Sequence, residues 1–104
     1  MYIMENSKFV LFFDNSLFLK DNNSLAIEAQ SFVLKENALK TIKKLKEIKG
    51  ISFIVLWQRF TNICHIYKLS DKTIIKEMKK KMRDIYKFKF KRKLVIKNIK
   101  VIEQ

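Results

Sequence analysis

Lysine and arginine are the side chains of this sequence best placed to do chemistry, because they gather in its last third. Residues 68–104 carry 14 basic and 4 acidic side chains, a net charge of +10. Residues 1–67 carry 9 basic and 6 acidic ones, so only +3 of the formal +13 lies there. Clustered cations attract phosphate backbones by releasing condensed counterions, which gives affinity without base specificity. The pattern predicts a polyanionic partner, RNA or another nucleic acid.

The expected binding surface joins a basic helix face to a basic strand face. Beyond Ser70, apolar residues at 74, 78, 82 and 85 form one helical stripe, with Met78 and Met82 in the core and the cations opposite. Over 87–96, lysines alternate with apolar residues, as in a half-buried strand. The expected binding residues are Lys76, Lys79, Lys80, Arg83, Lys87, Lys89, Lys91, Arg92 and Lys93.

Aromatic residues near this surface offer base stacking as a second interaction. Tyr86 falls at the junction of the expected helix and strand, where it could stack on an unpaired base. Phe88 and Phe90 share the parity of Leu94 and Ile96, so we expect them in the core. A low-GC coding bias, which raises Lys, Ile and Asn together, is the alternative source of the basic charge.

Asp14 is the one candidate catalytic acid, because it ends the first apolar run. The sequence FFDNS at 12–16 resembles the first motif of haloacid-dehalogenase phosphatases, although the family's second Asp is replaced by Ser16. A single carboxylate cannot act both as nucleophile and as general acid. Length and element order also resemble the smaller subunit of the CRISPR adaptation complex, without its Arg-rich first helix. A turn-forming Asp14 is the simpler interpretation.

Cysteine and histidine offer little further chemistry. Cys64 and His65 are neighbours on an expected strand and would project to opposite faces, so they should not form a thiol–imidazole pair. One Cys and one His also exclude a Cys/His zinc site and an internal disulfide. We therefore expect no metal and no cofactor, and we favour a binding protein over an enzyme.

The apolar runs predict the elements that position these residues. Strands are expected at 8–13, 51–57, 63–69 and 87–96, and helices at 24–49 and from 70 onward. Gly50 supplies the stop of the first helix. Residues 26–34 also suit a strand, and 16–20 could form a hairpin arm. The apolar alternation changes parity after Ile96, so the last strand requires a bulge or a break near 97–98.

This order predicts an α+β protein with a ferredoxin-like βαββαβ sandwich, two helices covering one face of an antiparallel sheet, and room for an extra N-terminal hairpin. The 104 residues suit one basic domain over 1–104, and 48% hydrophobic content indicates a folded chain. No apolar run approaches the roughly 20 residues of a membrane span. We expect a cytoplasmic or organellar-matrix protein that is not secreted.

Residues 65–98 resemble the C-terminal half of bacterial-type small-ribosomal-subunit protein six. The resemblance rests on the amphipathic helix ending in Arg83-Asp84 and on the basic strand start KRKLVIK at 91–97. It implies a ferredoxin-like fold and a role in binding ribosomal RNA beside a partner protein. The family's second-strand signature has no counterpart at 57–60.

Three functions follow from these patterns. The first is a non-enzymatic RNA-binding protein, such as a ribosomal or ribonucleoprotein component. The second is a small nucleic-acid-processing protein of the CRISPR-adaptation or toxin-nuclease kind that uses Asp14. The third is a degenerate haloacid-dehalogenase-like interaction module, which requires two parallel central strands. A protein partner could pair with a sheet edge, for which the run 53–57 is a candidate.

Overall fold

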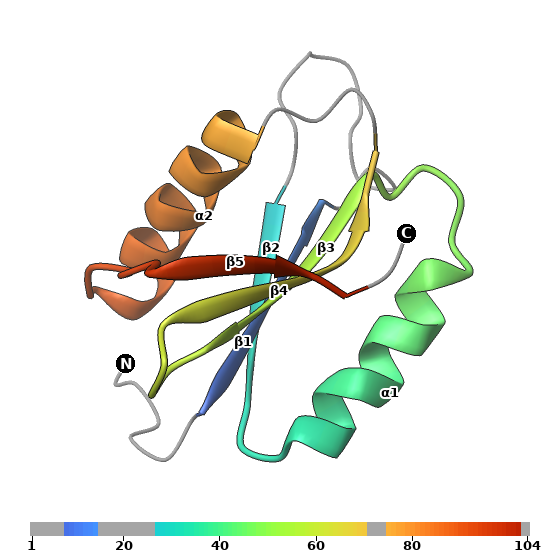
Figure 1. Cartoon of the computed structure of the whole chain (residues 1–104), viewed down its shortest axis with the longest axis horizontal. Coiled ribbons are helices and arrows are strands. Elements are labelled where there is room, and N and C mark those ends of the chain that lie inside the picture. Colours follow the sequence, from blue (N-terminus) through green and yellow to red (C-terminus); the bar gives the residue numbers. More distant parts are fainter. Residues whose placement is uncertain (1–7, 15–26, 71–74, 103–104) are drawn as a thin grey trace.

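A five-stranded mixed sheet with one helix on each face forms the protein (Figure 1). The computed structural model describes residues 8–14, 27–70 and 75–102. The elements are β1 (Phe9–Asp14), β2 (Ile27–Phe32), α1 (Lys35–Lys46), β3 (Phe53–Gln58), β4 (Ile63–Leu69), α2 (Ile75–Phe90) and β5 (Asn98–Val101). No helix in the described part of the chain is long and apolar enough to cross a membrane.

The strands lie in the order β2-β1-β3-β4-β5. β1 is antiparallel to both β2 and β3, and β3 is antiparallel to β4. β5 is parallel to β4, so β4, α2 and β5 form a βαβ unit. The α+β class is confirmed, but the order, the pairing and the placement of the helices differ from the ferredoxin-like sandwich that we expected.

The burial of β1 gives the physical reason for the placement of the two helices. All six of its residues are buried, so β1 faces a core on both sides of the sheet. One core contains Phe9, Leu11 and Phe13 and lies under α1, with Ala38, Ile42 and Leu45. The other contains Val10 and Phe12 and lies under α2. Two helices on one face would leave half of this apolar strand in water.

The first helix is shorter than the sequence pattern predicted. Residues 27–32 form β2, the hairpin partner of β1, and α1 occupies 35–46. The strand alternative for 26–34 is therefore the better description. The hairpin arm expected at 16–20 lies outside the described residues. Gly50 adopts a positive φ of 95° after the helix, as a glycine at a helix exit can.

The C-terminal part differs most from the sequence-based expectation. The strand expected at 87–96 does not form, because α2 continues to Phe90 and β5 begins only at Asn98. One more helical turn keeps Met82, Tyr86 and Phe90 on one face, and all three are buried. The strand expected at 63–69 is confirmed as β4. The run 53–57 is central rather than an edge, because β3 lies between β1 and β4.

Candidate nucleic-acid interface

α2 carries an unbroken line of cations along its outward side. Side chains at spacings of four, three and four lie along one line of a helix. Lys76, Lys80, Arg83 and Lys87 have this spacing and are all exposed, and we call these four the cationic stripe. Met78 and Met82 are buried on the opposite side, as predicted, and this burial fixes the orientation of the helix.

Acidic side chains lie beside the cationic stripe rather than within it. Glu77 and Asp84 occupy the neighbouring line of the helix, and both are exposed. Lys80 Nζ lies 3.8 Å from Asp84 Oδ2, with both side chains largely in solvent. An exposed pair of this kind contributes little free energy and is readily exchanged for another anion. The stripe therefore presents a predominantly positive surface.

The positive charge continues beyond the end of α2. Lys91 N donates to Lys87 O at 3.0 Å, so the helical hydrogen bonding extends to Lys91, just after the end of α2. Its φ of 59° is in the left-handed region, which redirects the chain. Arg92 and Lys93 follow and are exposed, whereas Lys79 is half-buried between the stripe and the sheet. Residues 75–93 carry 10 basic and 2 acidic side chains, a net charge of +8.

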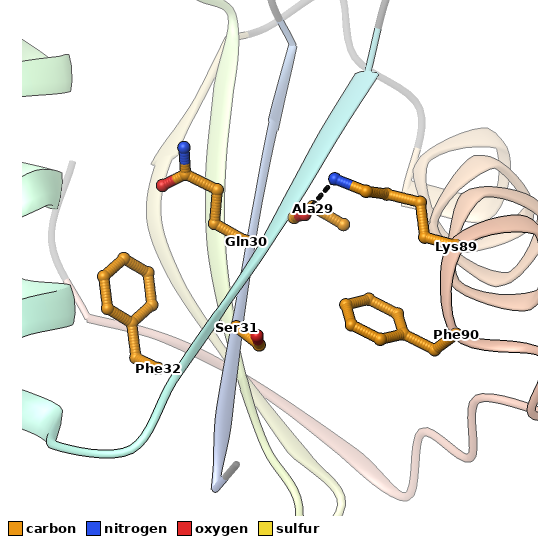
Figure 2. A pocket seen from close by; sticks show the side chains of 6 residues that line it. All are labelled: Ala29, Gln30, Ser31, Phe32, Lys89 and Phe90. Carbon is orange, nitrogen blue, oxygen red and sulfur yellow. Dashed lines mark hydrogen bonds between the residues drawn. The ribbon is translucent and has the colours of Figure 1, made fainter. Parts of the chain in front are cut away.

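Lys89 is separated from the other expected binding residues because it points toward the edge of the sheet. Its Nζ donates to the carbonyl oxygen of Ala29 on β2 at 2.8 Å and lies 3.6 Å from Glu28 Oε1 (Figure 2). A charged amine on an edge strand blocks pairing with another strand. Lys89 therefore contacts its own sheet, and we leave it outside the proposed interface.

An open groove of about 390 Å³ lies beside this contact, between β2 and the end of α2. It is lined by Ala29, Gln30, Ser31, Phe32, Lys89 and Phe90. Figure 2 shows Ala29 and Ser31 on the side of the strand that faces Phe90. Because the side chains of Ala29 and Ser31 are small, they do not fill the groove. A protein partner at this edge stays a prediction, and a strand added here would have to displace Lys89 from Ala29.

The structure exchanges the expected roles of Tyr86 and Phe88. Tyr86 is only 6% exposed and contacts the rings of Trp57 and Phe90 at centroid distances of 5.3 and 4.8 Å. Burial raises the pKa of its phenol, against the opposing charges of Arg59 and Arg92. Stacking of Tyr86 on a base was therefore a wrong prediction. Phe88, expected in the core, is 73% exposed.

Trp57 is also part of the core. It is buried, and its indole N–H donates to Val95 O at 2.9 Å. This hydrogen bond ties the segment after α2 to the end of β3. The segment at 91–97 is thus anchored although it forms no strand.

Asp14 occupies the geometry of a structural carboxylate. It is 1% exposed. Oδ1 accepts from Ser52 N at 2.7 Å and from Phe53 N at 3.1 Å, and Oδ2 accepts from the Ser52 hydroxyl at 2.7 Å. These bonds join the end of β1 to the start of β3. A buried carboxylate with both oxygens engaged is poorly placed to meet a substrate, and the geometry favours a structural role.

Cys64 and His65 point to opposite faces of β4, as predicted. Cys64 is buried in the core under α2, and burial raises the pKa of its thiol to about 12. His65 is half-buried, and desolvation followed by the charges of Lys35 and Lys100 lowers its pKa. Within the described ranges, no three His, Cys, Asp or Glu side chains gather closely enough to hold a metal ion.

Comparisons with known proteins add no family to this description. A scan of protein-family models and searches of curated proteins and of solved structures find no match for this chain. The resemblance of residues 65–98 to ribosomal protein six stays a prediction. The strand that this resemblance placed at 91–97 is absent, because β5 begins at Asn98.

Phe88 is the exposed aromatic residue of α2 that the sequence pattern misplaced. The sequence does contain a pattern that predicts this exposure: the apolar residues Met78, Met82, Tyr86 and Phe90 recur at intervals of four. That period extends the helix to 90 and turns Phe88 outward. Lys and Phe also alternate over 87–90, which is the period of a strand. The strand expected at 87–96 followed from this strand period instead of the helical period.

Proposed function

We infer that this protein binds nucleic acid, with RNA as the expected ligand, through the cationic stripe and residues 91–93. It acts in this proposal by binding rather than by catalysis. Lysine supplies most of the charge, so the phosphate backbone is the expected target and sequence preference should be small. A ribosomal or other ribonucleoprotein particle is the proposed setting, and the resemblance of residues 65–98 is its only support.

One observation carries this proposal, and it is a contrast with α1. The equivalent outward line of α1 carries Glu36, Lys40 and Lys43, and it continues to Glu47, the C-cap residue just after the helix. A glutamate therefore stands at each end of this line. The formal charge of the line is zero, whereas the four residues of the cationic stripe sum to +4. A coding bias toward lysine acts on both helices alike. A line of four exposed cations on α2, where the line of α1 is interrupted by acids at both ends, supports a polyanionic ligand.

The geometry gives less support to the two alternatives. A nuclease that uses Asp14 requires a carboxylate that can reach a phosphate or a metal ion, and Asp14 is buried. A haloacid-dehalogenase-like core requires parallel central strands, and β1 and β3 are antiparallel. We therefore propose no chemistry at Asp14.

Charge reversal on one helix at a time tests the proposed function. The test variant changes Lys76, Lys80 and Lys87 to Glu, and the control changes Lys40, Lys43 and Lys44 to Glu. All six lysines are exposed, so both variants should fold, and each undergoes the same change in charge. Binding is measured by fluorescence anisotropy with single-stranded RNA, the same sequence as DNA, and duplex forms of each, over a series of salt concentrations.

We expect the α2 variant to bind at least about tenfold more weakly. The slope of its log affinity against log salt concentration should become shallower by roughly 0.7 to 0.9 for each phosphate that the variant no longer neutralises. The α1 variant should retain most of the affinity. An equal decrease in both variants would contradict the interface, because only net charge would then matter. Affinity of the unaltered protein that does not change with salt would contradict the proposed function itself.

A further inference from the structure

Phe88 exposes an apolar ring beside the cationic stripe, on the helix line that also carries Glu77 and Asp84. It is 73% exposed on the outward side of α2, on the line next to the cationic stripe. Burying a phenylalanine ring is favourable by roughly 1.5–3 kcal/mol, so leaving it in water forgoes that stabilisation. Single exposed apolar residues are common in proteins, and exposure alone indicates no site. The surroundings of Phe88 supply the further observation.

Lys91 positions a cation over this ring. Its Nζ lies 5.4 Å from the centroid of Phe88, within the range of a cation–π contact. The backbone of Lys91 is held by its bond to Lys87 O. Lys91 therefore links the end of the cationic stripe to the aromatic ring. A ring beside a line of phosphate-binding cations is the combination that sequence-tolerant single-strand binding surfaces use.

We propose that Phe88 stacks on an unpaired base of a single-stranded nucleic acid while Lys91 and the cationic stripe hold the flanking phosphates. The inference rests on the proposed function. It adds that the protein prefers single-stranded nucleic acid to a duplex. Duplex bases are already stacked on each other, so their flat faces cannot meet Phe88. An apolar protein contact is disfavoured at this position, because burying the ring would also desolvate the neighbouring cations.

The chain offers a matched control for this proposal. Phe60 in the turn between β3 and β4 is 74% exposed, close to the 73% of Phe88. It lies outside α2 and the segment at 91–93. Phe88→Ala and Phe60→Ala therefore remove the same ring from equally exposed sites, and neither should lower the thermal midpoint appreciably.

We expect Phe88→Ala to weaken binding to single-stranded RNA by about 5- to 150-fold, the range that corresponds to the removal of one base–aromatic stack. Binding to duplex RNA should stay within about twofold. Phe60→Ala should change neither. Phe88→Leu keeps an apolar side chain but has no π-face, so it should bind single strands as weakly as Phe88→Ala. Phe88→Trp keeps a π-face and should bind single strands as the native protein does.

Trp at position 88 also reports contact directly. The native Trp57 is buried, so quenching on addition of single strands should come from the new side chain. Equal affinities of Phe88→Ala and Phe60→Ala for single strands would overturn the stacking proposal, as would an equal decrease for single and duplex RNA. Neither result affects the charge-reversal test, so the proposed function can stand when this inference fails.

Discussion

α1 and α2 lie on opposite faces of one sheet and share two positions of their buried sides, but they differ in the order of their outward charges. A shift of 40 positions aligns them: the buried Ala38 and Ile42 of α1 correspond to the buried Met78 and Met82 of α2. The same shift aligns Glu36 with Lys76, and it aligns Glu47, the C-cap residue just after α1, with Lys87. The core sides agree at these two positions and then diverge, because α1 next buries Leu45 whereas α2 buries Tyr86 and Phe90. The outward lines differ at both ends.

Charge totals hide this difference. α1 has 5 basic and 1 acidic residues, a net of +4, and α2 has 7 basic and 2 acidic residues, a net of +5. A biased codon composition accounts for totals of this size. It does not account for where the acids lie along a helix. The position of the acids along each helix, rather than the number of lysines, therefore distinguishes the candidate interface.

The cores under the two helices also differ. The core under α2 is aromatic, with Phe12, Trp57, Tyr86 and Phe90 linked by ring contacts. On the opposite face, α1 covers β1 and β3, while alternate residues of β4 at 63, 65 and 67 stay half-buried. α2 is therefore fixed by a more complete core. A fixed helix presents its outward charges in a defined geometry.

The largest change in the free energy of unfolding is expected on the core side of α2. Met78→Ala or Met82→Ala should each lower the free energy of unfolding by about 2–5 kcal/mol, because the smaller side chain buries less surface and leaves a cavity. Lys80→Ala, on the outward side, should stay within about 0.5 kcal/mol. Urea denaturation followed by circular dichroism measures both. A Lys80→Ala variant as destabilised as Met82→Ala would show that the orientation of α2, and the stripe with it, is wrong.

The next effect compares a buried acid with an exposed one. Asp14→Ala removes the acceptors of Ser52 and Phe53 and should cost about 1–3 kcal/mol, or more because the acceptor is charged. Asp84→Ala removes only the exposed pair with Lys80 and should cost less than about 1 kcal/mol. The same denaturation experiment measures both. Equal costs would contradict the structural role of Asp14, whereas nucleic-acid cleavage that disappears in a stably folded Asp14→Asn would favour the catalytic alternative.

The sequence predicted those parts of the fold where a local period decides the structure. The strand at 63–69 and the burial of Met78 and Met82 follow from alternation and from spacing by four. The run at 9–13 is apolar at every position, which is typical of a strand covered on both faces. Applied to the helices, this reasoning would have placed one on each side of the sheet. The ferredoxin-like prediction came from the order of the expected elements along the chain, without regard to which faces of the strands are apolar.

Other features depend on contacts between distant residues. β2 forms because β1 offers it a hairpin partner, although Ala29 and Phe32 also fit a helical spacing with Leu25. Over 87–90, strand and helix periods compete, and the space beside Trp57 and Tyr86 favours the helix. Of the expected binding residues, the structure places four in the cationic stripe and three in the segment after it. It places Lys79 half-buried and Lys89 at the edge of the sheet.

The smallest expected effect is the pH dependence of stability that arises from His65, a residue of β4 that α1 covers only in part. The pKa of His65 is lowered from its ordinary 6.5 by desolvation first and then by Lys35 and Lys100. Because the folded state binds this proton less tightly than the unfolded state, stability should fall as the pH drops below 6.5 and through the lowered pKa. His65 is the only histidine, so a proton NMR titration reports it without overlap. Lys35→Gln or added salt should raise the pKa partway, since screening removes the Coulombic part and leaves desolvation. His65→Gln should remove this share of the pH dependence, and an unshifted pKa in the native protein would show that this side of β4 is fully open to water.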